Sequence, residues 1–280
     1  MDIELLRTFL EVSRLRHFGR AGDKLHITQS AVSVRIRQLE ESLGVSLLTR
    51  NRNNIQLTPD GQRLKTHAET IVNTWVRACQ ETGLGPEYSS TLALGATWDL
   101  WDIFLNKWLT GARRDLPGIA LQIESHAAET LARKLLDGLL DLVLTFDPPQ
   151  LADMEIREVA VIKLVMVSTR QGQAVSSALA NNYIMVDWGT QFALNHARHF
   201  PEAPAPAIRM SQGALAFSYL MAHDGAAYLA EQSLRTCAGD QRLFRVKQAP
   251  VLERTAYAVY RPDAARDTGM QTAITLLKTC

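Results

Sequence analysis

The 280-residue sequence has few cysteines, no long apolar run and no recognisable targeting segment. Its three cysteines, Cys79, Cys237 and Cys280, lie far apart and form no C-x-x-C pair. This spacing argues against a disulfide framework or a structural zinc site and is typical of a reducing compartment. No apolar run reaches the roughly 18 residues of a membrane span, and the N-terminal stretch lacks the basic start and cleavage site of a signal peptide. We therefore expect a cytoplasmic protein without a membrane partner.

Motifs for catalysis, cofactor binding and metal binding are also scarce. The sequence contains no G-x-S-x-G elbow and no P-loop, and Gly83-Leu84-Gly85 lacks the third glycine of a dinucleotide fingerprint. His196 and His199 are spaced for one helical face, but no carboxylate or cysteine joins them at ligand spacing, so a surface helix is the expected context. We predict that the protein is not an enzyme and has neither a catalytic nor a metal site. It is also expected to need no cofactor.

The net charge of +1 hides an uneven distribution. Residues 1–66 carry 11 Lys and Arg against 7 Asp and Glu, a charge of +4, and the remainder of the chain is at −3. A small basic segment joined to a slightly acidic body favours contact with a polyanion through the basic segment alone.

The first 60 residues fit a helix-turn-helix. Apolar periodicity predicts helices over residues 2–14, 18–25 and 29–41, with a turn at His26-Ile27 between the second and third. Thr28 stands where the N-cap of the third helix belongs. In a helix-turn-helix, that last helix enters the major groove of DNA.

The predicted third helix has two faces. One is an apolar stripe, and the other presents hydroxyl, amide and guanidinium groups, which read base edges, beside an N-terminus that can bind phosphate. The outward Val34 would contact a thymine methyl group. A solvated amphipathic helix would show the same pattern, so the helix alone leaves both interpretations open. The candidate DNA-contacting residues are Thr28, Gln29, Ser30, Ser33, Val34 and Arg37.

The segment after this helix favours the DNA-binding interpretation. Residues 47–57, LLTRNRNNIQL, predict two short strands joined by a polar turn that carries Arg50 and Arg52. A basic hairpin beside a recognition helix is the wing of a winged helix-turn-helix, and its arginines are placed for backbone or minor-groove contacts.

The motifs across residues 1–66 resemble the N-terminal signature of LysR-type transcriptional regulators. The resemblance implies a sequence-specific regulator that recognises an interrupted dyad in double-stranded DNA as a dimer or tetramer, associated with the nucleoid and with RNA polymerase as a further candidate partner. This sequence departs from the common family pattern at three positions, His17, Gly22 and Val34. The motifs are Phe18-Gly19-Arg20-Ala21, Leu25-His26-Ile27-Thr28-Gln29-Ser30-Ala31-Val32-Ser33, Ile36-Arg37-Gln38-Leu39-Glu40, Leu43-Gly44-Val45 and Leu57-Thr58-Pro59-Asp60-Gly61.

Two stretches are more narrowly similar to enterobacterial regulators that repress the flagellar master operon. They are ELLRTFLEVSRLRHFGRAG and TRNRNNIQLT.

A long helix is predicted over residues 59–82, between the winged domain at 1–58 and a hinge at 83–89. It carries an apolar stripe at heptad spacing, which predicts pairing between two subunits. Packing of the stripe against its own domain is the alternative. The stripe comprises Leu64, Ala68, Ile71, Trp75 and Ala78.

Residues 90–280 alternate strand-like and helical stretches, which indicates parallel α/β packing. The family resemblance implies a periplasmic-binding-protein-like domain, with one lobe at 90–164 and 262–280 and another at 165–261. The whole chain is thus predicted to be an α+β multidomain protein.

Ligands of open α/β sheets bind beyond the carboxyl ends of the strands, so a cleft between the lobes is the expected effector site. Helix capping and core packing would also explain the polar and aromatic residues found there. Whether a small-molecule co-inducer exists is left open by the sequence. The candidate cleft residues are Thr97, Ser125, His126, Thr145 and Trp188.

Two other functions remain as alternatives at this point. One is an α/β ligand-binding or catalytic protein whose N-terminal helices serve only oligomerisation; the charge distribution and the wing arginines speak against it. The other is a structural nucleoid-type protein, which would show no preference among DNA sequences.

Overall fold

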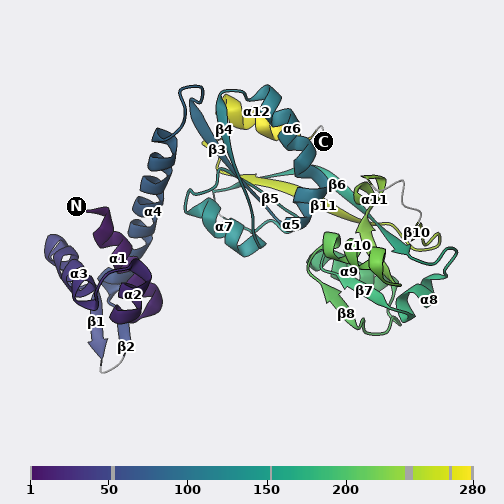
Figure 1. The fold of residues 1–280 in the computed structure, drawn as a ribbon, viewed down its shortest axis with the longest axis horizontal. Helices are drawn as coiled ribbons and strands as arrows, with labels where there is room; N and C mark the ends of the chain where they lie inside the picture. Colours follow the sequence, from purple (N-terminus) through teal and green to yellow (C-terminus); the bar gives the residue numbers. More distant parts are fainter. Residues whose placement is uncertain (1, 52–53, 152, 237–241, 265–266, 279–280) are drawn as a thin grey trace. The chain divides into compact units, whose positions relative to one another are not determined.

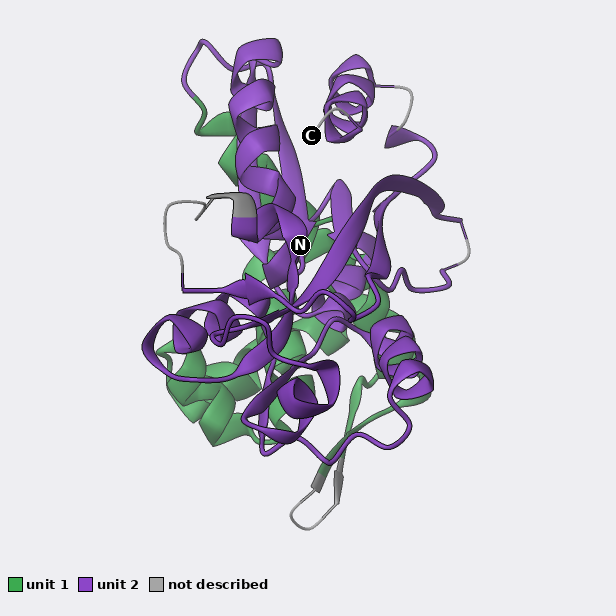
Figure 2. Ribbon diagram, turned by 90° about the vertical axis from the view of Figure 1, so that its right-hand side faces the viewer, with its two compact units in different colours: residues 1–84, 137–139 green, residues 85–136, 140–280 purple. Residues whose placement is uncertain are grey.

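The computed structural model describes residues 2–51, 54–151, 153–236, 242–264 and 267–278. The chain divides into two compact units, which Figure 2 shows in different colours. The first comprises residues 1–84 with 137–139, and the second comprises residues 85–136 with 140–280. None of the helices in the described ranges combines the length and apolarity needed to pass through a bilayer.

The first unit consists of three short helices, a hairpin and a long helix (Figure 1). The three expected helices and the two-stranded hairpin are confirmed. The helices α1 to α3 bury their apolar stripes against one another, and Phe9, Val32 and Leu39 are completely buried there. The elements are α1 (Ile3–Leu15), α2 (Phe18–Leu25), α3 (Gln29–Leu43), β1 (Leu48–Asn51), β2 (Asn54–Leu57) and α4 (Pro59–Thr82).

Two departures from the family pattern have a physical explanation in this unit. The His17 ring caps α2, because its Nδ1 accepts a hydrogen bond from the backbone N–H of Arg20 at 3.2 Å. At Gly22, a Cβ would lie 2.7 Å from the carbonyl oxygen of Ile27. Such an approach excludes a side chain, so glycine permits the tight turn into α3 although it costs about 1 kcal/mol of helix propensity relative to alanine.

The strands of the second unit that lie in the described residues form one sheet in the order β4-β3-β5-β11-β6-β9-β7-β8, with β10 beside β6. Parallel pairs occur at both ends, β3 with β4 and β5, and β7 with β8 and β9. The strands are β3 (Ser90–Ala96), β4 (Ile119–Ser125), β5 (Leu142–Thr145), β6 (Glu155–Ser168), β7 (Tyr183–Val186), β8 (Ile208–Met210), β9 (Ala226–Ala230), β10 (Phe244–Arg245) and β11 (Leu252–Tyr260).

The long antiparallel pair β6 and β11 joins the two parallel groups, and this gives the unit two lobes (Figure 1). One lobe holds β3, β4 and β5, and the other holds β7, β8 and β9. In the first lobe the indole of the buried Trp108 donates a hydrogen bond to the carbonyl of Ala273 at 2.9 Å, which fastens α6 to the C-terminal α12. The helices are α5 (Trp98–Leu100), the π-helical η1 (Trp101–Leu105), α6 (Asn106–Asp115), α7 (Ala128–Leu136), α8 (Val175–Ala180), α9 (Thr190–His199), α10 (Gly213–Ala222), α11 (Glu231–Thr236) and α12 (Thr268–Leu277).

Candidate DNA-binding surface and interlobe pocket

Helix α3 keeps the two faces expected of a recognition helix. Val32, Ile36 and Leu39 are buried in the core of the first unit. The opposite face is open to solvent, and Val34, an apolar side chain, is 48% exposed. Of the other candidate contact residues, Ser33 is half-buried and the rest are exposed, namely Thr28, Gln29, Ser30 and Arg37.

The start of α3 is capped from its own sequence. The hydroxyl of Thr28 accepts a hydrogen bond from the backbone N–H of Ala31 at 3.2 Å and lies 2.9 Å from the hydroxyl of Ser30. One of the unpaired N–H groups of the first turn is thus satisfied, and the remaining ones, with the helix dipole, stay suited to phosphate.

The two arginines of α3 have different surroundings. Arg35 reaches back to α1, where it donates a hydrogen bond to the Thr8 hydroxyl at 3.3 Å and pairs with Glu4 at 3.5 Å. Arg37 forms no ion pair within the described residues and is exposed. Arg35 therefore holds the helix in place, while the guanidinium of Arg37 is available for a ligand.

The wing is fastened to α3 by Glu40, which the sequence analysis did not single out. Its Oε1 accepts hydrogen bonds from the backbone N–H groups of Leu47 at 2.7 Å and Leu48 at 3.3 Å. At the residue before Leu47, the carbonyl of Ser46 accepts a hydrogen bond from the Thr58 hydroxyl at 2.7 Å. Glu40 is the last residue of the Ile36–Glu40 motif, so the sequence does contain it. Its partner Leu47 lies seven positions farther along, beyond a turn, so the spacing did not reveal the contact.

The wing arginines are not placed by the structure. Arg52 lies outside the described residues, and only the backbone of Arg50 is described, within β1. The hairpin itself pairs Leu48 with Leu57 and closes at Asn51 and Asn54. The contacts of both arginines with DNA remain predictions.

The apolar stripe of α4 divides into two parts. Ala68 is completely buried in the core of its own unit, and Leu64 packs against that core. Leu64 and Ala68 therefore pack within their own chain, which is the alternative that the sequence left open. The Ala68 side chain is not available for contact with a second subunit. Farther along, Ile71 is 40% and Trp75 is 50% exposed, and Ala78 is exposed as well. These three stay candidates for contact with a partner.

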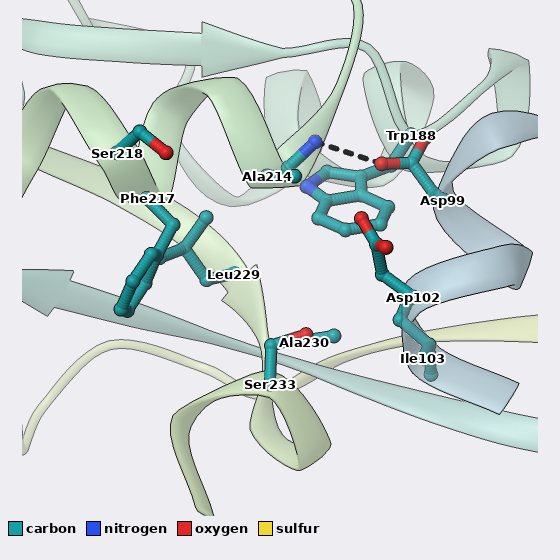
Figure 3. A pocket seen from close by; sticks show the side chains of 11 residues that line it. Asp99, Asp102, Ile103, Trp188, Ala214, Phe217, Ser218, Leu229, Ala230 and Ser233 are labelled. Carbon is teal, nitrogen blue, oxygen red and sulfur yellow. Dashed lines mark hydrogen bonds between the residues drawn. The ribbon is translucent and has the colours of Figure 1, made fainter. Parts of the chain in front are cut away.

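A pocket of about 160 Å³ lies between the two lobes of the second unit (Figure 3). Asp99, Asp102 and Ile103 come from the first lobe. The second lobe contributes the aromatic rings of Trp188 and Phe217, and its remaining lining residues are Gly213, Ala214, Ser218, Leu229, Ala230 and Ser233.

Asp99 is the polar link across this pocket. Its Oδ1 accepts a hydrogen bond from the backbone N–H of Gly213, the first residue of α10, at 2.7 Å, drawn as the dashed line in Figure 3. Burial raises the pKa of Asp99 to about 6, the Gly213 hydrogen bond opposes this rise, and repulsion from Asp102 and Asp187 adds to it. The pocket is thus a site where negative charge accumulates.

One of the predicted cleft residues, Trp188, lines the pocket. Its indole N–H donates to the carbonyl of Tyr228 at 2.9 Å, which holds the ring in place. The hydroxyl of Thr145 accepts a hydrogen bond from the backbone N–H of Asp147 at 3.2 Å, and His126 lies 2.8 Å from the carboxylate of Glu124. The other four predicted cleft residues do not line this pocket, and their part in effector binding stays a prediction. They are Thr97, Ser125, His126 and Thr145.

A buried arginine close to Trp188 escaped the sequence analysis. Arg254, on β11, is only 4% exposed; it donates to Oδ1 of Asp147 at 2.8 Å and lies over the ring of Phe146. A Cβ on Gly189, which precedes α9, would lie 2.8 Å from this guanidinium. Arg254 and Asp147 therefore tie a connecting strand to the first lobe at the place where the second lobe approaches.

The prediction that His196 lies on a surface helix is wrong, because its side chain is buried. It is 4% exposed on α9, and its Nε2 lies 2.8 Å from the hydroxyl of Tyr183. Burial lowers the pKa of His196 to about 4, and repulsion from His199 contributes. The neutral ring is thus a core residue that shares a hydrogen bond with the Tyr183 hydroxyl.

This burial predicts loss of stability in acid. Between the ordinary histidine pKa of about 6.5 and its lowered value of about 4, the unfolded chain binds more protons at His196, so stability falls as the pH drops. The full loss is about 3 kcal/mol, reached below the lowered pKa of about 4, and about 2 kcal/mol of it is expected at pH 5. Urea unfolding of the whole protein at pH 7.5 and at pH 5 measures it, and His196→Gln should flatten the change. His199→Gln, at the exposed neighbour whose repulsion is the smaller cause of the lowered pKa, should keep most of it; an equal pH dependence in wild type and His196→Gln would contradict the assignment.

A winged helix-turn-helix joined to a two-lobed α/β domain defines a DNA-binding transcriptional regulator with a sensor domain. Residues 3–62 match the family model of the bacterial regulatory helix-turn-helix protein, lysR family, and residues 85–279 match the LysR substrate binding domain. The chain belongs to the LysR family of transcriptional regulators.

Individual relatives agree with this assignment. The HTH-type transcriptional regulator HdfR of Yersinia enterocolitica is 35% identical over 277 residues, 96% of this chain and 93% of the relative. CbnR, a LysR family transcriptional regulator, has a TM-score of 0.68 at 16% identity, with 100% of this chain and 99% of the other covered. Vibrio fischeri DarR in complex with DNA has a TM-score of 0.61 at 20% identity, with 99% and 98% covered. The last two likenesses show the fold.

Proposed function

We propose that this LysR-type regulator reads an interrupted dyad as a dimer, with one α3 in the major groove of each half-site. The exposed face of α3 supplies the base and phosphate contacts, and Arg50 and Arg52 anchor the wing to the DNA backbone. The observation that carries this proposal is the guanidinium of Arg37, which is exposed and forms no ion pair within the described residues, on the same helix to which Glu40 fastens the wing. The contacting residues are Thr28, Gln29, Ser30, Ser33, Val34, Arg37, Arg50 and Arg52.

The proposal assigns one role to each part of the chain. Residues 1–58 bind DNA, 59–82 pair the subunits, 83–89 form a hinge and 90–280 regulate. The two family matches, which end at residue 62 and start at residue 85, support this division. Within the regulatory part we assign 90–164 with 262–280 to one lobe and 165–261 to the other.

The same proposal covers the cellular setting. The protein acts in the cytoplasm at the nucleoid, as a regulator and not as an enzyme. Its dimers pair into tetramers on DNA, and RNA polymerase is the partner through which it acts.

A footprint on the DNA flanking its own gene, taken across a salt series, tests the proposal. A protected, interrupted dyad on one face of the duplex is expected, and its extent separates dimer from tetramer. Uniform coating without boundaries would instead identify a non-specific binder, because that binding rests on phosphate charge alone. No protection at low salt would contradict DNA reading by α3.

Replacing the unpaired arginine, Arg37→Ala, should weaken binding to the protected site by about 1–3 kcal/mol and relax base preference at one position of each half-site. Fluorescence anisotropy on the operator and on a scrambled duplex measures both effects. Arg14→Ala is the matched control, because Arg14 is exposed and pairs with Glu11 on α1. An equal loss on both duplexes would make Arg37 a phosphate contact and contradict base reading.

A further inference from the structure

We propose that the interlobe pocket binds a small organic cation, an amine with a compact aromatic or apolar body, and that Asp99 and Asp102 hold its ammonium group. The inference rests on the proposed function in one respect, that the second unit is the regulatory part of the protein. It goes beyond that function because it names the chemistry of the effector.

The charged groups of the pocket are all of one sign. Asp99 and Asp102 are the only ionisable side chains among the described lining residues, and Asp187 is close enough to repel Asp99. None of these three forms an ion pair with a described side chain, and the described residues hold no three-ligand cluster for a metal ion. An anionic effector would meet repulsion here, whereas an ammonium ion would supply the missing charge.

The hydrogen bonding of the two carboxylates also favours an ammonium ligand. Asp99 uses Oδ1 for the backbone N–H of Gly213, and its other oxygen has no partner within the described residues. Asp102, one turn along, has none either. In Figure 3 both carboxylates lie beside the indole of Trp188. An ammonium group with three donors can bond to oxygens of both residues at once.

The rest of the lining is apolar and aromatic. Ile103 and Leu229 form aliphatic walls, and Trp188 and Phe217 present rings. Aromatic faces attract a cation within about 6 Å, tryptophan most strongly, so the rings suit both the body of such a ligand and its charge. Ser218 and Ser233 add hydroxyl groups, which can donate or accept a hydrogen bond.

The size of the pocket limits the body of the ligand. A volume of about 160 Å³ is close to the roughly 150 Å³ of an apolar cavity that accommodates one benzene molecule. One ring or a short aliphatic chain therefore fits, with the amine carried on a short arm toward the carboxylates.

The position of the pocket gives binding a route to regulation. The two carboxylates belong to one lobe, and Trp188, Phe217 and the start of α10 belong to the other. A cation held by Asp99 and covered by the rings contacts both lobes, so its binding energy depends on how they are arranged. An effector shifts that arrangement by its difference in affinity for the two states.

Calorimetric titration of the full-length protein with benzylamine tests the proposal, with benzyl alcohol and benzoate as neutral and anionic molecules of the same shape. We expect benzylamine to bind at least tenfold more tightly than either. Butylamine extends the test to an aliphatic body. The proposal is overturned when neither amine binds in the millimolar range, or when the alcohol or the acid binds as well as benzylamine.

Variants decide whether the binding is at this pocket. Asp99→Asn and Asp102→Asn should each weaken benzylamine binding at least tenfold, while asparagine at 99 still accepts the Gly213 hydrogen bond. Asp153→Asn is the matched control, because Asp153 is exposed, does not line the pocket and has a φ of 63° that asparagine tolerates. Undiminished benzylamine binding by the Asp99→Asn/Asp102→Asn double variant would contradict the proposal.

A footprint with the same preparation keeps the two hypotheses apart. Protection of a dyad without amine binding leaves the DNA-reading function standing and removes the cation inference. Amine binding that depends on Asp99 and Asp102, without any footprint, removes the proposed function and leaves the pocket chemistry in place.

Discussion

Trp75→Asp should convert the protein to a monomer and weaken its binding to dyad DNA by on the order of 100-fold, because two linked heads bind far more tightly than one. Trp75 is half-exposed on α4, in line with Ile71 and Ala78, so its large ring lacks cover within its own chain. An aspartate there would place a carboxylate from each subunit in an apolar contact. Sedimentation velocity gives the oligomeric state, and anisotropy gives the DNA affinity.

The control for this variant carries the same charge on the same helix. Thr66→Asp lies about 160° around α4 from the centre of the stripe, and Thr66 is exposed. It should leave both the oligomeric state and the affinity near the wild-type values. A Trp75→Asp protein that stays dimeric would show that the subunits pair through another surface.

Asp147→Ala should destabilise the second unit by about 1–3 kcal/mol, because it leaves the buried Arg254 guanidinium without a counter-charge, while the Asp147 side chain itself is 46% exposed and loses little on removal. Arg254 is 4% exposed and bonds to Asp147 at 2.8 Å. Its Nε already lacks a hydrogen-bond partner among the described residues, so loss of the carboxylate removes the one charged contact it has. Chemical denaturation followed by circular dichroism measures the change.

Two further variants separate a buried charge from simple loss of packing. Asp147→Asn combined with Arg254→Met should recover much of the lost stability, because methionine replaces the buried charge with an apolar group and asparagine keeps a polar group at the half-exposed position 147. Asp224→Ala removes the partner of Arg170 in a pair with both side chains more than 60% exposed, and should cost less than about 1 kcal/mol. Equal costs for Asp147→Ala and Asp224→Ala would show that Arg254 finds another partner.

These two residues also bear on regulation. Asp147 follows β5 of one lobe, Arg254 lies on the connecting strand β11, and the close approach of Gly189 brings in the start of α9 from the other lobe. The ion pair is thus at the joint of the two lobes, while the pocket of Asp99 lies between them. A variant at the joint should therefore change the response to an effector as well as the stability.

The N-terminal unit could be predicted almost entirely from the sequence. Its helices are defined by local signals, namely the apolar period of 3.6 residues and the Thr28 cap. Helix α3 was expected over 29–41 and found over Gln29–Leu43, where Gly44 follows in the left-handed conformation that ends a helix. The faces of a helix follow from residue spacing, so the buried Val32 and the exposed Val34 needed no tertiary information. The alternation of strands and helices likewise indicated the α/β unit.

Only the tertiary structure decided which residues meet. Asp99 and Gly213 are 114 positions apart, and Asp147 and Arg254 are 107 apart, so no local pattern links them. The heptad of α4 could not reveal that Ala68 packs into its own unit while Trp75 does not. The sequence by itself determined α3 and its two faces, because backbone periodicity and capping act over a few residues. The pocket, the buried histidine and the ion pair depend on how distant strands and helices pack, and that was decided by the fold.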